Sequence, residues 1–118
     1  MKTIFIVDDS DTNLAMAEGA LEDHFRALKI PSAEKMFQLI EKITPDLILL
    51  DIEMPEMNGF EALERLKADE SKANIPVIFL TGTVDTSIEL KSAQLGAVGL
   101  ITKPFSQSLL IELINSHI

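Results

Sequence analysis

Short apolar runs alternate along the chain with longer stretches in which apolar residues recur every three or four positions. Compact runs rich in Val, Ile, Leu and Phe indicate strands, and the three-to-four spacing indicates amphipathic helices. The pattern predicts strands near residues 3–7, 25–30, 46–50, 76–80 and 97–101. It predicts helices near residues 11–23, 32–43, 59–69, 85–95 and 106–117.

Regular alternation of strand and helix is typical of βαβ units and a parallel sheet. The run Leu47–Leu50 is apolar at every position, as expected for a strand that helices cover on both faces. Right-handed crossovers restrict the topology, and a small five-stranded sheet of this kind commonly has the strand order 2-1-3-4-5. We therefore expect a doubly wound α/β fold with a five-stranded parallel sheet in that order.

Polar residues mark where the helices are expected to begin. Suitable capping side chains precede the first four predicted helices, namely Ser10 or Asp11, Ser32, Asn58, and Asp85 or Thr86. Thr86 and Glu89 have the spacing of a capping box. In the last predicted helix, an apolar stripe is expected to face the core: Leu109, Leu110, Leu113 and Ile114. Met16 and Met36 are expected to fill core or loop space.

Composition narrows the class of protein. The 118 residues suit one domain, residues 1–118, and 47% of them are hydrophobic, which is enough for an ordinary core. No apolar run approaches the ~20 residues of a membrane span, and no signal peptide is evident. The absence of cysteine excludes disulfides and is compatible with a cytoplasmic location. A net charge of −9 counts against direct binding to nucleic acid or to an anionic membrane.

Four polar motifs each follow an apolar run, where a predicted strand ends. They are Asp8-Asp9, Asp51, Thr81 and Lys103-Pro104. Because the C-terminal ends of parallel strands lie along one edge of the sheet, where ligands bind, these groups are expected to meet in one pocket. The pocket would contain three carboxylates, a hydroxyl and an ammonium group.

Carboxylates that lie close together repel one another, so the arrangement needs a proton or a cation. Magnesium suits a site whose ligands are all hard oxygens. Asp51 is the best candidate for a nucleophile, because a carboxylate can form an acyl phosphate. The Thr81 hydroxyl and the Lys103 ammonium could then hold the phosphoryl oxygens. The four motifs together predict a magnesium-dependent aspartyl-phosphate site.

At this point the chain resembles a known family over its whole length. The segments IFIVDDSDTNL, DLILLDIEMPEMNGFE, PVIFLTG and GLITKPF are similar to the response-regulator receiver domains of two-component signalling. The resemblance implies the flavodoxin-like fold typified by CheY. It implies that Asp51 accepts a phosphoryl group from a phosphohistidine of a histidine kinase or a histidine phosphotransfer protein. Such a domain is a signalling phosphoprotein with self-phosphorylation and slow autodephosphorylation, and it is not a turnover enzyme.

The resemblance also implies roles for individual residues. Mg²⁺ would be bound by Asp9, Asp51 and the backbone carbonyl of Glu53, with Asp8 acting mainly through water. Thr81 and Lys103 would contact the phosphoryl group. Its arrival would shift the loop after the fourth strand and the face formed by the fourth helix, fifth strand and fifth helix. That face would bind a downstream protein, an output domain outside this sequence, or a second copy in a homodimer.

One position departs from the family pattern. Receivers usually carry Tyr or Phe three residues before the lysine of the last strand, and Leu100 stands there. We therefore expect the output to depend on movement of the fourth helix and its preceding loop.

Two alternatives follow from the same residues. A degenerate receiver would bind partners without being phosphorylated, although the complete set of motif residues argues against it. Haloacid-dehalogenase-like phosphatases also combine a nucleophilic Asp, a Thr or Ser, a Lys and an acidic pair. In those enzymes the nucleophile comes first and the acidic pair last, which is the reverse of the order here.

Overall fold

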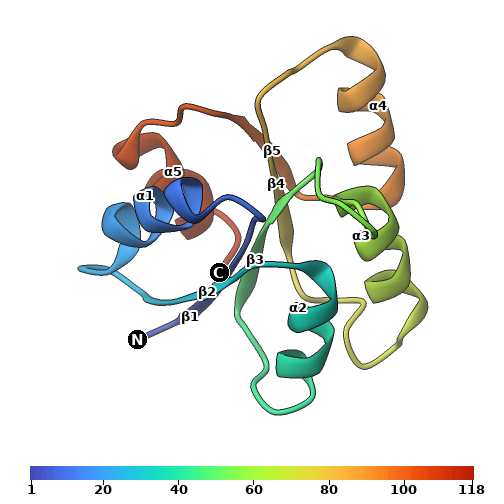
Figure 1. Ribbon diagram of the computed structural model, residues 1–118, viewed down its shortest axis with the longest axis horizontal. Helices are drawn as coiled ribbons and strands as arrows, with labels where there is room; N and C mark the ends of the chain where they lie inside the picture. The colour runs from blue at the N-terminus through green and yellow to red at the C-terminus, as the bar shows by residue number, and fades with distance from the viewer.

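The computed structural model describes residues 1–118, in which five strands and five helices alternate (Figure 1). The strands are β1 (Thr3–Val7), β2 (Arg26–Ile30), β3 (Leu47–Asp51), β4 (Val77–Thr81) and β5 (Gly99–Thr102). The helices are α1 (Asp11–Leu21), α2 (Ala33–Ile40), α3 (Gly59–Ala68), α4 (Thr86–Leu95) and α5 (Gln107–Asn115). None of these helices has the length and apolar character needed to cross a lipid bilayer.

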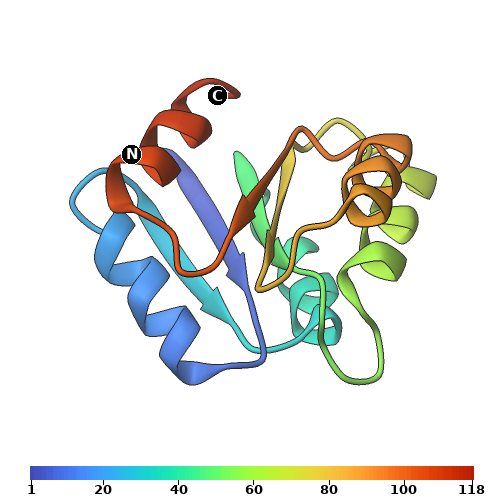
Figure 2. The ribbon, with the colours of Figure 1, turned by 90° about the horizontal axis from the view of Figure 1, so that it is seen from above.

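The strands form one parallel sheet in the order β2-β1-β3-β4-β5, so the predicted fold class and strand order are confirmed. Figure 2 shows the sheet between two helical layers, with α1 and α5 on one face and α2, α3 and α4 on the other. The order reverses between β1 and β3, which are neighbours in the sheet. The residues that follow these two strands therefore lie next to each other.

Two hydrophobic clusters fill the space between the sheet and its helices. Successive residues of the central strand alternate between them: Leu47 and Leu49 belong to the cluster under α1 and α5, and Ile48 and Leu50 belong to the other. All four side chains are fully buried. This two-sided burial explains why the strand is apolar at every position. It also fixes the position of Asp51, the last residue of that strand.

The helix starts match the predicted caps with one correction. Side-chain oxygens of Ser10, Ser32, Asn58 and Asp85 each accept a backbone N–H from the first turn of α1, α2, α3 and α4, respectively. Because Asp85 is the cap of α4, the capping box predicted for Thr86 and Glu89 is wrong. The observed capping box lies in α3, where Asn58 and Glu61 each accept the other's backbone N–H.

Other differences from the prediction concern burial and element ends, which the spacing of apolar residues did not determine. Leu109 was expected in the core, but 53% of its surface is exposed, because α5 directs Leu110 and Ile114 inward instead. Met16 lies on the outer side of α1 and is 49% exposed, whereas Met36 of α2 is fully buried. Element ends differ from the predicted ends by up to three residues. The largest such difference is at α2, which gives way to a turn after Ile40.

Gly59 allows α3 to begin directly against the end of β3. Its backbone N–H donates to the carbonyl of Ile52 at 2.8 Å. A Cβ atom at this position would lie 2.4 Å from the carbonyl oxygen of Asp51 and 2.8 Å from the Cα of Ile52. No side chain fits at these distances from backbone atoms. The chain can therefore follow this path around Asp51 only because residue 59 has no side chain.

We expect Gly59→Ala to destabilise the protein, by about 1–3 kcal/mol, because the backbone after Asp51 must move to admit the methyl group. Gly19→Ala is the matched control. Gly19 lies inside α1 with open space around it, so alanine there should stabilise by roughly 0.5–1 kcal/mol. Urea unfolding of both variants measures the two free energies. Equal effects from the two substitutions would contradict this account of Gly59.

Candidate functional site

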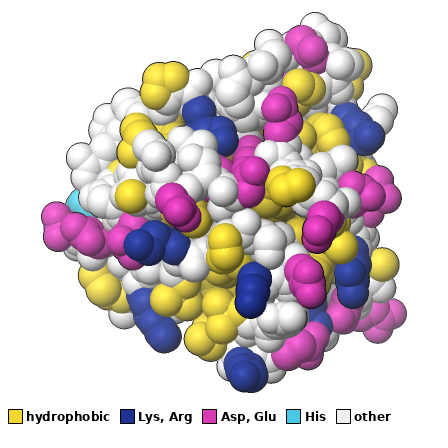
Figure 3. All heavy atoms as spheres, viewed as in Figure 1, with side chains coloured by type: hydrophobic (Ala, Val, Ile, Leu, Met, Phe, Trp, Pro, Cys, Tyr) yellow, Lys and Arg dark blue, Asp and Glu magenta, His cyan; other side chains and the backbone are white.

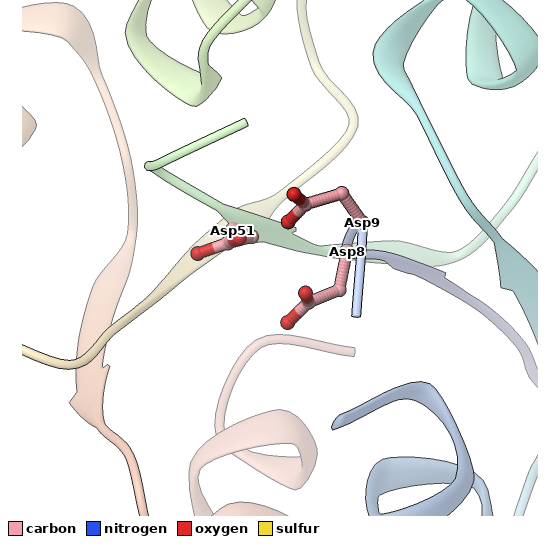
Figure 4. A group of neighbouring side chains, drawn as sticks. All are labelled: Asp8, Asp9 and Asp51. Atoms are coloured by element: carbon pink, nitrogen blue, oxygen red, sulfur yellow. The ribbon is translucent and has the colours of Figure 1, made fainter. Parts of the chain in front are cut away.

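A small polar hollow lies at the C-terminal edge of the sheet. Asp8 and Asp9 follow β1, Asp51 ends β3, and Lys103 follows β5. Figure 4 shows the three aspartates side by side, two from the end of β1 and one from β3. Segments distant in sequence are thus brought together by the strand order. The residues that line the hollow are Asp8, Asp9, Asn13, Asp51, Glu53, Gly82 and Lys103.

Three carboxylates form the acidic centre of the hollow. Asp8, Asp9 and Asp51 each offer one oxygen, and these oxygens all lie within 4.8 Å of one another. Asp8 and Asp51 are buried, whereas Asp9 is exposed. Acidic side chains are also spread over the surrounding surface (magenta in Figure 3), in keeping with the net charge of −9. Hard oxygens at this spacing fit Mg²⁺ or a similar divalent cation.

The ammonium group of Lys103 lies between the two buried carboxylates. Its Nζ is 3.0 Å from Asp8 Oδ2 and 3.2 Å from Asp51 Oδ1. The Lys103 backbone N–H donates to the carbonyl of Thr81 at 2.7 Å, and the following peptide bond to Pro104 is cis. One positive charge therefore partly balances the repulsion between Asp8 and Asp51.

The two aspartates after β1 differ in how many of their carboxylate oxygens already make hydrogen bonds with the protein. Asp8 accepts the Ser10 backbone N–H on Oδ1 at 2.9 Å and the Lys103 ammonium on Oδ2. Both of its oxygens are therefore engaged in hydrogen bonds with the protein. Asp9 is exposed and offers its carboxylate to the hollow. Asp9 is therefore the carboxylate of this pair that makes no hydrogen bond with the protein.

Burial, and after it the nearby charge of Asp8, raise the pKa of Asp51 to about 6 against the opposing effect of Lys103. For Lys103, burial acts to lower the pKa, but its hydrogen bonds and charge interactions with Asp8 and Asp51 raise it overall. The ammonium therefore stays charged at neutral pH. Without a further cation, the hollow holds more negative charge than Lys103 can balance.

Thr81 stands at the end of β4, but its hydroxyl does not line the hollow. The side chain is buried, and Oγ1 donates to the Thr83 carbonyl at 2.8 Å and accepts the Thr83 backbone N–H at 3.2 Å. In this conformation the hydroxyl is not among the groups that line the hollow, and its contact with a phosphoryl group stays a prediction. Two hydrogen bonds within the loop after β4 hold the hydroxyl there instead.

The sequence analysis missed two residues that line the hollow, Asn13 and Gly82. Gly82 directly follows Thr81, so its place at the sheet edge could have been inferred from the strand end. Asn13 lies one helical turn beyond Asp9, in the first turn of α1. Its spacing from the acidic pair was the available signal, because a helix that begins at the sheet edge keeps its first turn near that edge. Glu53 also lines the hollow, and its side chain is exposed.

Comparison with known proteins identifies the family. Residues 4–115 match the response regulator receiver domain, and the chain belongs to this family. The polar-differentiation response regulator DivK of Brucella ovis is 33% identical over 118 residues, which are 99% of this chain and 96% of that protein. A probable cyclic di-GMP phosphodiesterase of Vibrio cholerae is 38% identical over 116 residues, but the match covers only 26% of that longer protein.

Solved structures support the same assignment. A putative response regulator from Chloroflexus aurantiacus has a TM-score of 0.92 at 28% identity, over 98% of this chain and 95% of that one. The chemotaxis protein CheY4 of Vibrio cholerae has a TM-score of 0.93 at 24% identity, over 100% of this chain and 99% of that one, and shows the fold alone. The chain is thus a receiver domain of two-component signalling with a CheY-like fold.

The raised pKa of Asp51 predicts a pH dependence of stability in the metal-free protein. The folded chain keeps the Asp51 proton up to about pH 6, whereas the unfolded chain releases it near the ordinary value of 3.8. Since the folded state binds more protons in this interval, its stability should fall as the pH rises through it. Relative to Asp51→Asn, the wild type should lose about 2–3 kcal/mol between pH 4 and pH 7.

Urea unfolding in a buffer with EDTA, at several pH values, measures this difference. Asp51→Asn keeps the shape of the side chain without its titration, so it serves as the reference. Parallel stability curves for the two proteins would show that Asp51 has an ordinary pKa.

Proposed function

We propose that this receiver domain accepts a phosphoryl group on Asp51 from a phosphohistidine of a histidine kinase or histidine phosphotransfer protein. The observation that carries the proposal is the pairing of a buried carboxylate at a strand end with two neighbouring carboxylates and a bridging ammonium group. Asp51 is buried and lines the polar hollow, so a phosphoryl donor would approach it through the hollow.

Mg²⁺ fits the donor set of the hollow. Asp9, Asp51 and the backbone carbonyl of Glu53 would hold it directly, and Asp8 would hold it through water. When bound, the ion would offset the carboxylate charge and the charge of the phosphoryl oxygens. The engaged oxygens of Asp8 support its indirect role.

In the transfer step, an Asp51 carboxylate oxygen forms a bond to phosphorus while the bond from phosphorus to the donor's imidazole nitrogen breaks. The nitrogen keeps the electron pair of that bond. Lys103, now hydrogen bonded to Asp51, would turn its ammonium to the phosphoryl oxygens that replace the lost carboxylate charge. Burial of Asp51 limits the access of water to the acyl phosphate, which suits a modification that persists as a signal.

The output step would start at Thr81. Releasing its hydroxyl from the Thr83 carbonyl would let it contact the phosphoryl group and draw in the loop before α4. Ser92 is the only buried residue of α4, Ile88 and Leu95 pack against the core only partly buried, and Leu90 is 57% exposed, so limited packing would oppose a shift of this helix. Leu100 packs at the edge of the core from β5, without the aromatic ring that receivers usually carry there.

The face around α4 and β5 would bind the downstream protein, an output domain or a second copy of the chain. Val84, Leu90 and Val98 expose apolar surface there. In the phosphodiesterase relative the receiver-like part is a fraction of a longer protein, so an attached output module is one arrangement this type of domain takes. We place the protein in the cytoplasm, where kinases of two-component systems present their phosphohistidine.

The test is the intact mass of the protein after incubation with acetyl phosphate, with Mg²⁺ or with EDTA. We expect a single phosphoryl adduct that depends on Mg²⁺ and is absent from Asp51→Asn. Asp46→Asn is the control, because Asp46 is an aspartate at the opposite end of β3, outside the hollow, and should leave the adduct unchanged.

Two other outcomes would overturn the proposal. A wild-type protein without an adduct, with acetyl phosphate unconsumed, would identify a degenerate receiver that acts only by binding partners. Continuous consumption of acetyl phosphate without an adduct would indicate phosphatase turnover.

A further inference from the structure

We infer that the side-chain amide of Asn13 binds the phosphoryl group of the incoming donor, as a contact residue additional to Thr81 and Lys103. This inference depends on the proposed function of Asp51. It rests on the composition of the hollow and on the hydrogen bonds already made within it. It also rests on the strand order, which places Asn13 and Lys103 on opposite flanks of β3.

The hollow is short of hydrogen-bond donors. Its lining contains four carboxyl groups, those of Asp8, Asp9, Asp51 and Glu53, and one ammonium group, that of Lys103. A divalent cation would still leave one formal negative charge when all five groups are ionised. A phosphoryl group adds further negative charge and three acceptor oxygens, so it requires neutral donors in addition to the metal and the lysine.

Most of the donors near the hollow are already engaged. Lys103 donates to both Asp8 and Asp51, and the Thr81 hydroxyl donates to Thr83. In Asn13, the backbone N–H donates to Ser10 Oγ at 3.2 Å, whereas the side-chain amide is committed to no other protein group. Asn13 is also the only lining residue with a neutral side-chain donor. Its NH₂ group is therefore available to a ligand without breaking an existing interaction.

The strand order places the Asn13 amide on the opposite side of Asp51 from the strands that lead to Gly82 and Lys103. Asp51 ends the central strand β3. Gly82 and Lys103 reach the hollow from β4 and β5, on one flank of β3, whereas Asn13 reaches it from α1, after β1, on the other flank. On that flank Asn13 would add a direct hydrogen bond to a phosphoryl group on Asp51, beside the metal that Asp9 would help to hold.

An amide at this place also differs in charge from a carboxylate or a lysine. It adds no charge to the metal site, so it can bind phosphoryl oxygens without repelling the carboxylates or displacing the cation. Asn13 lies in the first turn of α1, and the Ser10 cap fixes that turn. The amide is thus presented from a rigid element, as a positioned contact requires.

The test compares Asn13→Leu, which keeps the approximate size of the side chain without a donor, with Asn13→Asp, which keeps its shape but adds charge. Thr12→Ala, at an exposed position of the same turn outside the hollow, is the control. Two ligands are used: acetyl phosphate, read by intact mass, and Mg²⁺ with beryllium fluoride, a phosphoryl analogue whose bound form is read by ¹⁹F NMR. Mg²⁺ affinity alone is measured by calorimetry.

We expect Asn13→Leu to slow phosphorylation and to weaken beryllium fluoride binding by about tenfold, as for the loss of one hydrogen bond to a charged group. Its Mg²⁺ affinity and melting temperature should stay close to those of the wild type and of Thr12→Ala. Asn13→Asp should weaken beryllium fluoride binding further while strengthening Mg²⁺ binding, because it adds a carboxylate.

Wild-type values for both ligands in Asn13→Leu would overturn the inference and leave the function of Asp51 intact. An equal loss of Mg²⁺ affinity in Asn13→Leu would also overturn it, because Asn13 would then belong to the metal site. If the wild type takes neither an adduct nor beryllium fluoride, the proposed function fails, and the role of Asn13 fails with it.

Discussion

Electrostatic repulsion among carboxylates that the fold forces together is the constraint on which the rest of the site depends. Asp8 and Asp51 are buried because they end or follow fully buried strands, and the 2-1-3 part of the strand order makes those strands neighbours. Separating the charges would require a different sheet. The protein instead offsets them with Lys103, which lies between the two carboxylates, and leaves the remainder for a cation. The need for a counter-charge at this site is thus a consequence of topology.

The sequence was sufficient to predict the sheet and the charged centre of the site. Strands such as Leu47–Asp51 are recognisable because their burial on both faces permits only apolar residues, and a polar residue at their end is then conspicuous. Once the alternation of strands and helices indicates a doubly wound sheet, the positions of Asp8, Asp51 and Lys103 follow from the strand order. Local pattern and global fold agree here, so prediction succeeds.

Prediction failed where several local arrangements have similar free energies. Asp85 and Thr86 can both cap a helix, and only the path of the preceding loop decides between them. The hydroxyl of Thr81 is bonded to Thr83, and sequence patterns do not fix the χ1 rotation that sets its partner without moving the strand. Glu56 adopts a positive φ of 68°, which sequence rules assign to glycine, in a loop that the close approach of Gly59 to Asp51 constrains. These features depend on tertiary contacts.

A conformational switch also needs local arrangements whose free energies are similar. Asp51 ends the fully buried strand β3 and is fixed by it, whereas the hydroxyl of Thr81 is held by hydrogen bonds to Thr83 in the exposed loop from Gly82 to Asp85. A ligand shifts such an equilibrium only by interacting differently with the two states. Under the proposed function, a phosphoryl group on Asp51 would meet this condition, because its oxygens would accept the Thr81 hydroxyl in one arrangement of the loop and not in the other. Since Leu100 offers no aromatic ring to follow that movement, α4, in which Ser92 is the one buried residue, would carry the change to the surface under this proposal.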